Sequence, residues 1–398
     1  MLHICLIFVI FIIDLSYQTI SINPNQNDDS RLTVLEIISK YGYPAEKHKV
    51  ITEDGYYLTL HRIPSGRNNT ISSDRSRPAV LLQHCILCSS AVFVLTGPQK
   101  ALAFVLADKG YDVWMGNARG TKYSKGHKEL SIRNPKYWEF SWHEMGVYDV
   151  AAEIDYILKV TSQKKLYYIG HSMGTTMMFA LLSARPEYNQ KVRLFVSLSP
   201  VAYMSHMKST VFRILYGPLA LILRTMGFQE FVPHNGLVSR LSRMICEIQA
   251  TSSIICSNAL FLISGYDSQQ LDTAMLPTIF GHIPAGTSIS SLVHYGQSMV
   301  TGDFRYYDHG PAGNMKHYKT KMCPQYNLSQ IVAPSAFFYS SNDWLADLKD
   351  VKKLKEQIPN LVLSNKIPLP TFNHMDFLFA KDVVQLVYKE VLAILKKY

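Results

Sequence analysis

The chain has 398 residues, of which 47% are apolar and 18% charged, and this composition excludes a disordered, collagen-like or low-complexity protein. Its 40 Lys and Arg outnumber its 30 Asp and Glu, but these cations lie singly or in pairs, so we expect no nucleic-acid partner. The sequence holds no apolar stretch of the roughly 18 to 20 residues that span a bilayer, which argues against an integral membrane protein.

The N-terminus carries a ten-residue apolar run over residues 4–13, closed by Asp14. This length is typical of the central region of a secretory signal peptide, and we expect residues 1–19 to be removed on secretion. A buried first strand is the alternative interpretation. Two Asn-x-Ser/Thr triplets, at Asn68 and Asn327, predict glycosylation sites that are usable only in the secretory pathway.

Apolar strand-like runs alternate with helical patterns in the next part of the chain. Strands are predicted over 80–84, 111–115, 166–169 and 193–198, and helices over 97–109, 147–160 and 175–184. Such alternation predicts an α/β fold with a mostly parallel sheet covered on both faces.

The pattern changes at about residue 201, and up to residue 325 it is helical, apolar and without clear strands. Alternation then resumes, with strands over 336–340 and 361–367 and helices over 348–357 and 377–397. We therefore expect one core domain, made by residues 20–200 and 326–398, with a helical cap over 201–325. The apolar cap stretch 211–231 suits either a surface that contacts lipid aggregates or the interior of the cap.

One G-x-S-x-G motif occurs, at residues 170–174, between a predicted strand and a predicted helix. A serine on such a strand-to-helix turn is held in a strained, exposed position, so Ser172 is the candidate nucleophile. The alternative is a plain glycine turn. If Ser172 is the nucleophile, the backbone N–H of Met173 is one donor for the oxyanion, and the loop 84–87 after an early strand should supply the other.

A nucleophilic serine needs a histidine base and an acid that orients this base. In such a fold the acid follows the serine along the chain, and the histidine follows the acid. Only His374 of the fourteen histidines lies beyond residue 317, on the loop before the last helix. Asp343 directly follows the strand over 336–340 and is the candidate acid, whereas Asp347 is better placed as an N-cap of the next helix.

The cysteines give weaker signals. Cys85 and Cys88 form a C-x-x-C with no second pair to complete a zinc site, and we interpret them as small buried side chains. Cys246 and Cys256 are ten residues apart and could close a small loop. The sequence predicts no metal site and no dinucleotide-binding glycine motif, and hydrolysis through an acyl-enzyme needs no cofactor.

From about residue 35 to the C-terminus the chain resembles an acid lipase of the gastric and lysosomal type, a family of α/β-hydrolases. The resemblance rests on TEDGY at 52–56, GNARG at 116–120, FSWHEM at 140–145, GHS at 170–172, PAGTS at 284–288, DWLAD at 343–347 and NHMD at 373–376. It implies an α/β-hydrolase fold with a mobile cap over a lipid-ester site.

The resemblance also assigns roles to residues of this chain. It implies the catalytic triad Ser172, Asp343 and His374, an oxyanion hole made by the backbone N–H groups of Ile86 and Met173, and a cap disulfide between Cys246 and Cys256. The chain departs from the family pattern at two places. It has Cys85 where the family has Gly after His, and a Cβ there could strain the loop or narrow the acyl slot. It also has Met173 where the family usually has Gln.

These observations predict a secreted serine lipase that hydrolyses neutral lipid esters, triacylglycerol or cholesteryl ester, at a micelle or droplet interface. The net positive charge would favour approach to an anionic lipid surface, and the lysosomal lumen is an alternative location. A short-chain carboxylesterase with the same chemistry and a non-catalytic lipid-binding protein on the same fold are the alternatives. The sequence does not indicate an oligomeric state.

Overall fold

The computed structural model describes residues 29–67, 77–232 and 249–398. Its centre is an eight-stranded sheet in the order β1-β2-β4-β3-β5-β6-β9-β10. The strands are β1 (Glu46–Ile51), β2 (Tyr57–Ile63), β3 (Ala79–Gln83), β4 (Asp112–Met115), β5 (Leu166–His171), β6 (Val192–Leu198), β9 (Ser335–Tyr339) and β10 (Leu361–Lys366).

The sheet is parallel from β4 to β10, which confirms the predicted α/β fold class. Strands β3 and β5 are buried along their whole length, because helices cover both faces of a parallel sheet. The sequence analysis missed β1 and β2, which pair antiparallel with each other and extend the sheet beyond β4.

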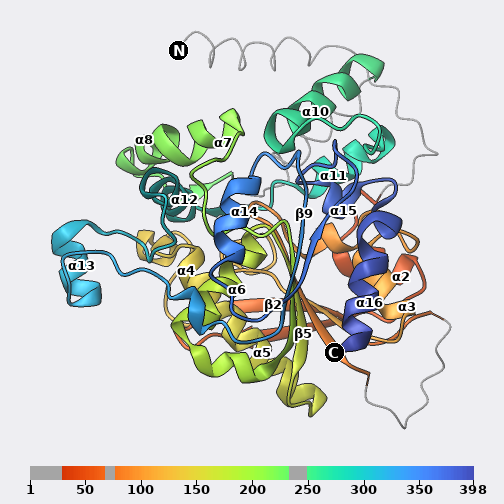
Figure 1. Ribbon diagram of the computed structural model, residues 1–398, viewed down its shortest axis with the longest axis horizontal. Helices are drawn as coiled ribbons and strands as arrows, with labels where there is room; N and C mark the ends of the chain where they lie inside the picture. The colour runs from red at the N-terminus through yellow and green to blue at the C-terminus, as the bar shows by residue number, and fades with distance from the viewer. Residues whose placement is uncertain (1–28, 68–76, 233–248) are drawn as a thin grey trace.

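Helices pack against both faces of this sheet (Figure 1). One face is covered by α5 (Ala151–Thr161) and α6 (Met173–Ala184), which share an apolar core with the sheet residues Tyr168 and Phe195. The other face is covered by α3 (Leu102–Asp108) and α16 (Lys389–Lys397), together with the sheet residues Val80 and Ile169.

The remaining core helices have eight residues or fewer. They are α2 (Val34–Lys40), α4 (Trp142–Glu144), η4 (Met145–Val150), α14 (Leu348–Lys355), α15 (Asp376–Phe379) and η9 (Val384–Tyr388), with 3-10 turns at Ser90–Phe93, Pro135–Trp138, Pro186–Lys191 and Leu328–Gln330. The single final helix predicted over 377–397 is therefore wrong in detail, because the helix breaks after Phe379 before η9 and α16 follow.

Residues 201–325, which we call the cap segment, connect β6 to the part of the chain that leads into β9. The described part of this segment holds α7 (Thr210–Ile214), η6 (Leu215–Leu219), α8 (Ala220–Thr225), β7 (Glu230–Phe231), α10 (Gln249–Ser264), η7 (Thr273–Met275), α11 (Leu276–His282), β8 (Thr287–Ser288), α12 (Ile289–Thr301) and α13 (Gly310–Tyr318). Helices α7, α8, α10 and α12 gather at one end of the molecule (Figure 1).

Two expectations for the cap segment need correction. It does contain strands, since β7 and β8 form a two-residue antiparallel pair. The helical pattern over 211–231 ends at Thr225 and is interrupted by the non-helical backbone of Gly217 before Pro218. Within the three described ranges, the helices are all too short or too polar to cross a bilayer.

Candidate active site

The chain passes directly from β5 into α6 at Ser172, which has φ 55° and ψ −117°. The glycines on either side make this turn possible. A Cβ on Gly174 would lie 2.3 Å from the carbonyl oxygen of Gln83, and a Cβ on Gly170 would lie 2.7 Å from Gly174. Only residues without side chains fit at both positions. Ser172 has the expected strained backbone, but the expected exposure is wrong, because packing around the turn leaves only 6% of its surface exposed.

The predicted base and acid are in contact. His374 Nδ1 lies 2.9 Å from Asp343 Oδ1 and 3.0 Å from Oδ2, and both residues are only 1% exposed. The backbone N–H groups of Leu345 and Ala346 donate to Asp343 Oδ1 at 2.9 and 2.8 Å. Burial raises the pKa of Asp343, but His374 and these donors outweigh burial, so the net pKa lies below its ordinary value and the carboxyl stays ionised.

His374 is also fixed beside the turn that carries Ser172. The Nε2–H of His171 donates to the carbonyl of His374 at 2.9 Å, and the two rings lie 5.0 Å apart. Burial, with His374 nearby, lowers the pKa of His171 to about 3, so His171 is a neutral donor. Among the described residues, the buried Nε2 of His374 has no hydrogen-bond partner, and this is the atom that a general base would use.

Sequence reasoning missed Ser199, which lies at the carboxyl end of β6. Its Oγ–H donates to Asp343 Oδ2 at 2.5 Å, and the same oxygen lies 2.8 Å from His374 Nδ1. Ser199 is fully buried, has φ 56° and is held by a backbone bond to Phe338 at 2.8 Å. No local pattern indicated this role, since a serine at a strand end is common and the contact needs three separate loops.

The loop after β3 presents the first predicted oxyanion donor. His84 Nδ1–H donates to the carbonyl of Cys85 at 2.7 Å, and His84 Nε2 accepts from the Ala118 N–H at 3.1 Å. Burial lowers the pKa of His84 to about 4, which keeps the ring neutral and fixes this tautomer. The Ile86 N–H makes no hydrogen bond within the described part of the chain.

The second predicted donor is the N–H of Met173, the first residue of α6. It likewise has no partner among the described residues, as expected for an N–H in the first turn of a helix. The Met173 side chain is 1% exposed and fills the interior, so the change from Gln leaves the backbone donor in place.

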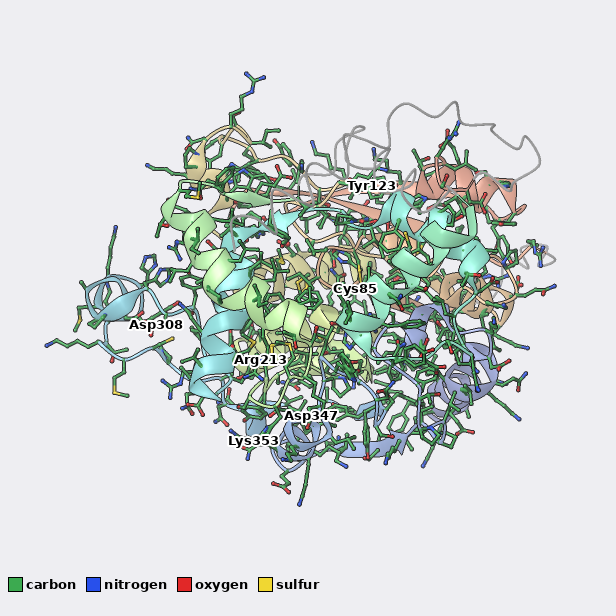
Figure 2. The ribbon with its side chains drawn as sticks, turned by 90° about the horizontal axis from the view of Figure 1, so that it is seen from above. Cys85, Tyr123, Arg213, Asp308, Asp347 and Lys353 are labelled. Carbon is green, nitrogen blue, oxygen red and sulfur yellow. A yellow bond between two sulfur atoms is a disulfide. The ribbon has the colours of Figure 1, made fainter. Side chains whose placement is uncertain are left out.

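Cys85 and Cys88 are buried, as expected, but they are joined by a disulfide, which the sequence analysis did not predict. The expected strain at Cys85 is also absent, because the residue with positive φ in this loop is Leu87, at 60°. Cys85 lies in the interior of the molecule in the view from above (Figure 2).

The other predicted site residues lie elsewhere. Asp347 is the N-cap of α14 and accepts from Lys349 N–H at 2.8 Å, as expected. Cys256 is disulfide-bonded, whereas Cys246 lies outside the described residues, so their pairing stays a prediction. Asn327 is exposed and Asn68 lies outside the described residues, and glycosylation at both stays a prediction.

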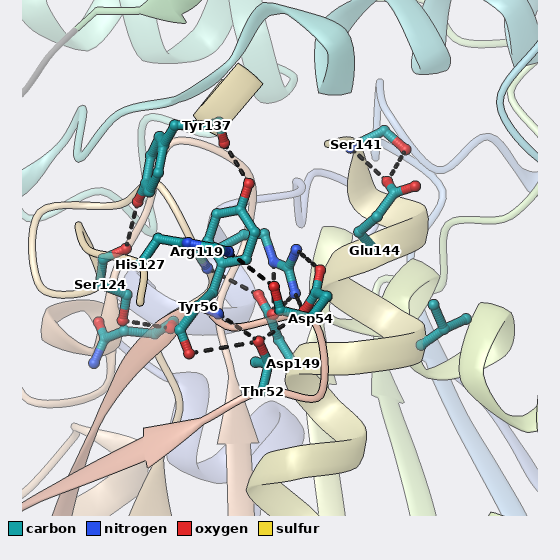
Figure 3. Close-up of polar contacts among 12 residues, drawn as sticks. Thr52, Asp54, Tyr56, Arg119, Ser124, His127, Tyr137, Ser141, Glu144 and Asp149 are labelled. Atoms are coloured by element: carbon teal, nitrogen blue, oxygen red, sulfur yellow. Dashed lines mark hydrogen bonds and ion pairs between the residues drawn. The ribbon is translucent and has the colours of Figure 1, made fainter. Parts of the chain in front are cut away.

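Two of the motifs that carry the resemblance, at 52–56 and 116–120, meet around Arg119 (Figure 3). The buried guanidinium donates to Asp149 Oδ1 at 2.7 Å and to both oxygens of Asp54 at 2.5 and 2.8 Å, and it stacks 3.9 Å from the Tyr56 ring. Burial raises the pKa of Asp149 to about 6 in spite of Arg119. These groups satisfy one another, so this cluster holds the core together. The described residues contain no group of three His, Cys, Asp or Glu that could bind a metal ion.

Comparison with known proteins agrees with this geometry. The family described as "Partial alpha/beta-hydrolase lipase region" matches residues 34–97, and the family described as "alpha/beta hydrolase fold" matches residues 78–249. Among solved structures, an epoxide hydrolase from Vigna radiata superposes with a TM-score of 0.50 at 15% identity, covering 89% of this chain and 98% of that one. The chain is thus an α/β-hydrolase.

Proteins with higher sequence identity show which family of α/β-hydrolases the chain belongs to. Lipase 3 of Drosophila melanogaster is 41% identical over 367 residues, covering 91% of this chain and 92% of its own. The gastric triacylglycerol lipase of Bos taurus is 39% identical, with 93% and 92% covered, and human lipase member K is 37% identical, with 94% and 93% covered. The chain belongs to the acid lipase family of α/β-hydrolases, and it is a carboxylic ester hydrolase.

Proposed function

We propose that this protein is a secreted serine lipase that hydrolyses the ester bonds of neutral lipids through an acyl-enzyme on Ser172. The observation that carries the proposal is the Asp343–His374 pair, held beside the turn of Ser172 with His374 Nε2 unpaired. A carboxylate that fixes Nδ1 and leaves Nε2 free is the arrangement that a general base needs.

The reaction follows from these positions. Ser172 Oγ attacks the ester carbonyl carbon while His374 Nε2 takes the serine proton. The N–H groups of Ile86 and Met173 hold the negative oxygen of the tetrahedral intermediate. His374 Nε2–H then protonates the leaving alcohol, and a water molecule activated by the same nitrogen hydrolyses the acyl-enzyme.

Asp343 and Ser199 orient the base throughout. Both buried groups contact His374 Nδ1, so the ring presents Nε2 to the substrate and the positive charge that develops on it meets a carboxylate. The depressed pKa of Asp343 keeps that carboxylate charged into the acidic range.

The cap segment supports a lipid substrate. Along α7–α8, side chains four residues apart (Phe212, Tyr216 and Ala220) are buried, whereas seven apolar side chains on the remaining surface are 38% to 66% exposed. We call these seven the cap patch: Val211, Ile214, Leu219, Leu221, Ile222, Met226 and Phe228. An exposed apolar surface of this extent suits contact with a micelle or droplet, and the gastric relatives are named for triacylglycerol.

The proposed location rests on the signal-like N-terminus and on the sequon at Asn327. This asparagine is exposed, so the folded protein can carry a glycan there. The lysosomal lumen is the alternative within the secretory pathway.

The test is active-site labelling of the purified protein with a fluorophosphonate, followed by mapping of the modified residue. We expect one label per chain on Ser172, and no label and no turnover for Ser172→Ala with an unchanged unfolding midpoint. Retained hydrolysis by Ser172→Ala would refute the assignment of the nucleophile.

A short-chain carboxylesterase is separated from a lipase by substrate form. We expect the ratio of activity on emulsified long-chain esters to activity on soluble short-chain esters to fall at least about 10-fold in Leu221→Glu/Ile222→Glu, because two charges in the cap patch oppose contact with lipid. Val332→Glu, at an apolar residue that is 58% exposed outside the cap segment, is the control. Equal ratios in both variants would favour the esterase.

A further inference from the structure

The Cys85–Cys88 disulfide closes a four-residue turn that contains the proposed oxyanion donor. The two Cα atoms lie 5.2 Å apart, and the Cys88 N–H donates to the Cys85 carbonyl at 3.2 Å. Ile86 and Leu87 are the central residues of this β-turn, and the φ of 60° at Leu87 belongs to its second central position.

The hydrogen bonds of the turn determine where the Ile86 N–H points. The Cys85 carbonyl accepts from both His84 Nδ1–H and Cys88 N–H, and the C=O and N–H of a trans peptide point in opposite directions. Fixing the Cys85 carbonyl therefore fixes the Ile86 N–H on the other side of the same peptide plane. On that side the N–H makes no hydrogen bond to another group of the described chain.

This turn has little intrinsic support. Leu87 has a left-handed backbone, which a leucine rarely adopts and which glycine or asparagine would favour. The turn also has one hydrogen bond to a distant part of the chain: the Ala285 N–H of the cap segment donates to the Leu87 carbonyl at 2.6 Å. A covalent link between the first and last residues of the turn removes the extended conformations into which it would otherwise open.

We propose that the Cys85–Cys88 disulfide is a positioning element of the oxyanion hole, which holds the Ile86 N–H toward the reacting carbonyl. Both cysteines act through Ile86 and are positioning residues. The inference rests on the proposed function and adds a pair of residues that the serine, histidine and aspartate roles do not include.

The first test compares Cys85→Ser/Cys88→Ser with Cys323→Ser, which removes a buried free thiol elsewhere in the described chain. We expect kcat on a soluble short-chain ester to fall about 10-fold in the double variant while KM stays within about twofold, because a misplaced donor weakens only the transition state. Cys323→Ser should match the wild type. A double variant with a lower unfolding midpoint but unchanged kcat would overturn the proposal, since a merely structural disulfide affects stability alone.

Hydrogen exchange of the peptide covering residues 84–95 supplies a readout that does not depend on activity. We expect the amide of residue 88 to exchange faster in the double variant than in the wild type, and equal exchange would overturn the proposal. If the wild-type protein neither hydrolyses esters nor reacts with a fluorophosphonate, the proposed function fails, and this exchange comparison still decides whether the disulfide holds the turn.

A third measurement uses the folded wild-type protein in case the double variant does not fold. A water-soluble phosphine reduces each disulfide to two thiols and takes its oxygen from water, and alkylation with mass mapping then gives the reduced fraction at Cys88 and at Cys256 separately. We expect the loss of kcat to follow reduction at Cys88. Loss that follows Cys256 alone would overturn the proposal.

Discussion

Asp376 gives the sharpest prediction about pH and stability. It lies two residues after His374, is 4% exposed, and its Oδ2 accepts from the Asn373 N–H at 2.7 Å. Burial, together with the carboxyl groups of Asp267 and Asp343, raises its pKa from an ordinary value of 3.8 to about 8, although the Asn373 N–H acts to lower it. The folded protein therefore keeps Asp376 protonated at pH values where the unfolded chain has already ionised it.

Proton linkage gives the sign and size of the effect of Asp376 on the free energy of unfolding. Between pH 5 and 7 the folded state binds almost one more proton here than the unfolded state, so this residue lowers the free energy of unfolding as the pH rises. At 1.36 kcal/mol per pH unit, the loss over this interval is about 2.5 kcal/mol. Asn cannot ionise and has nearly the shape of the protonated acid, so Asp376→Asn should remove this loss.

Urea unfolding at pH 5 and pH 7 measures the effect. We expect the difference in the free energy of unfolding, Asp376→Asn minus wild type, to be about 2.5 kcal/mol larger at pH 7 than at pH 5. Comparing the variant with the wild type at each pH cancels the contributions of other groups, such as the buried His84. Glu139→Gln, at an exposed carboxyl, should show no such change between the two pH values. If the difference for Asp376→Asn is the same at both pH values, Asp376 is ionised in the folded protein and the reasoning is refuted.

Three further substitutions test the site and its support. Ser199→Ala removes one donor to Asp343 and should lower kcat/KM about 10-fold, or about 1.4 kcal/mol, on a soluble ester; an unchanged value would show that the donor is dispensable. Gly174→Ala places a Cβ 2.3 Å from the Gln83 carbonyl oxygen and should abolish labelling by a fluorophosphonate, so full labelling would contradict the tight packing of the turn. Arg119→Met leaves two buried or half-buried aspartates unpaired and should cost about 3 to 5 kcal/mol in urea unfolding, and a cost below about 1 kcal/mol would contradict this account.

Most of the parallel part of the sheet could be predicted because β3, β4, β5, β6 and β9 are buried almost throughout and so read as continuous apolar runs. The edge strand β10 is only partly buried. Strand β1 was not predicted, because its residues 46–51 are mostly polar and only one of them is buried. It is defined by its backbone pairing with β2, which leaves no apolar pattern in the sequence. Strands β7 and β8 have two residues each, too few for a periodic pattern.

Some residues of the candidate site could likewise be proposed from the sequence, whereas others could not. Ser172, Asp343 and His374 were proposed from the sequence because each directly follows a predicted strand or lies on the loop before a predicted helix, and their order along the chain is informative. Ser199 and the Cys85–Cys88 disulfide were missed because they depend on tertiary geometry. The disulfide closes a turn in which Leu87 is left-handed, a conformation that the residue type does not predict.

The hydrogen bond from Ala285 to Leu87 has a consequence for exchanging parts between relatives. The acceptor belongs to the loop after β3, and the donor lies just before the start of β8, almost two hundred residues later. A chimaera that replaces the whole segment 201–325 to alter acyl-chain preference also imports a foreign donor to that loop. A graft that stops before residue 283 keeps the native pair, so the two junctions separate the effect of a new lipid-facing surface from damage to the chemical step.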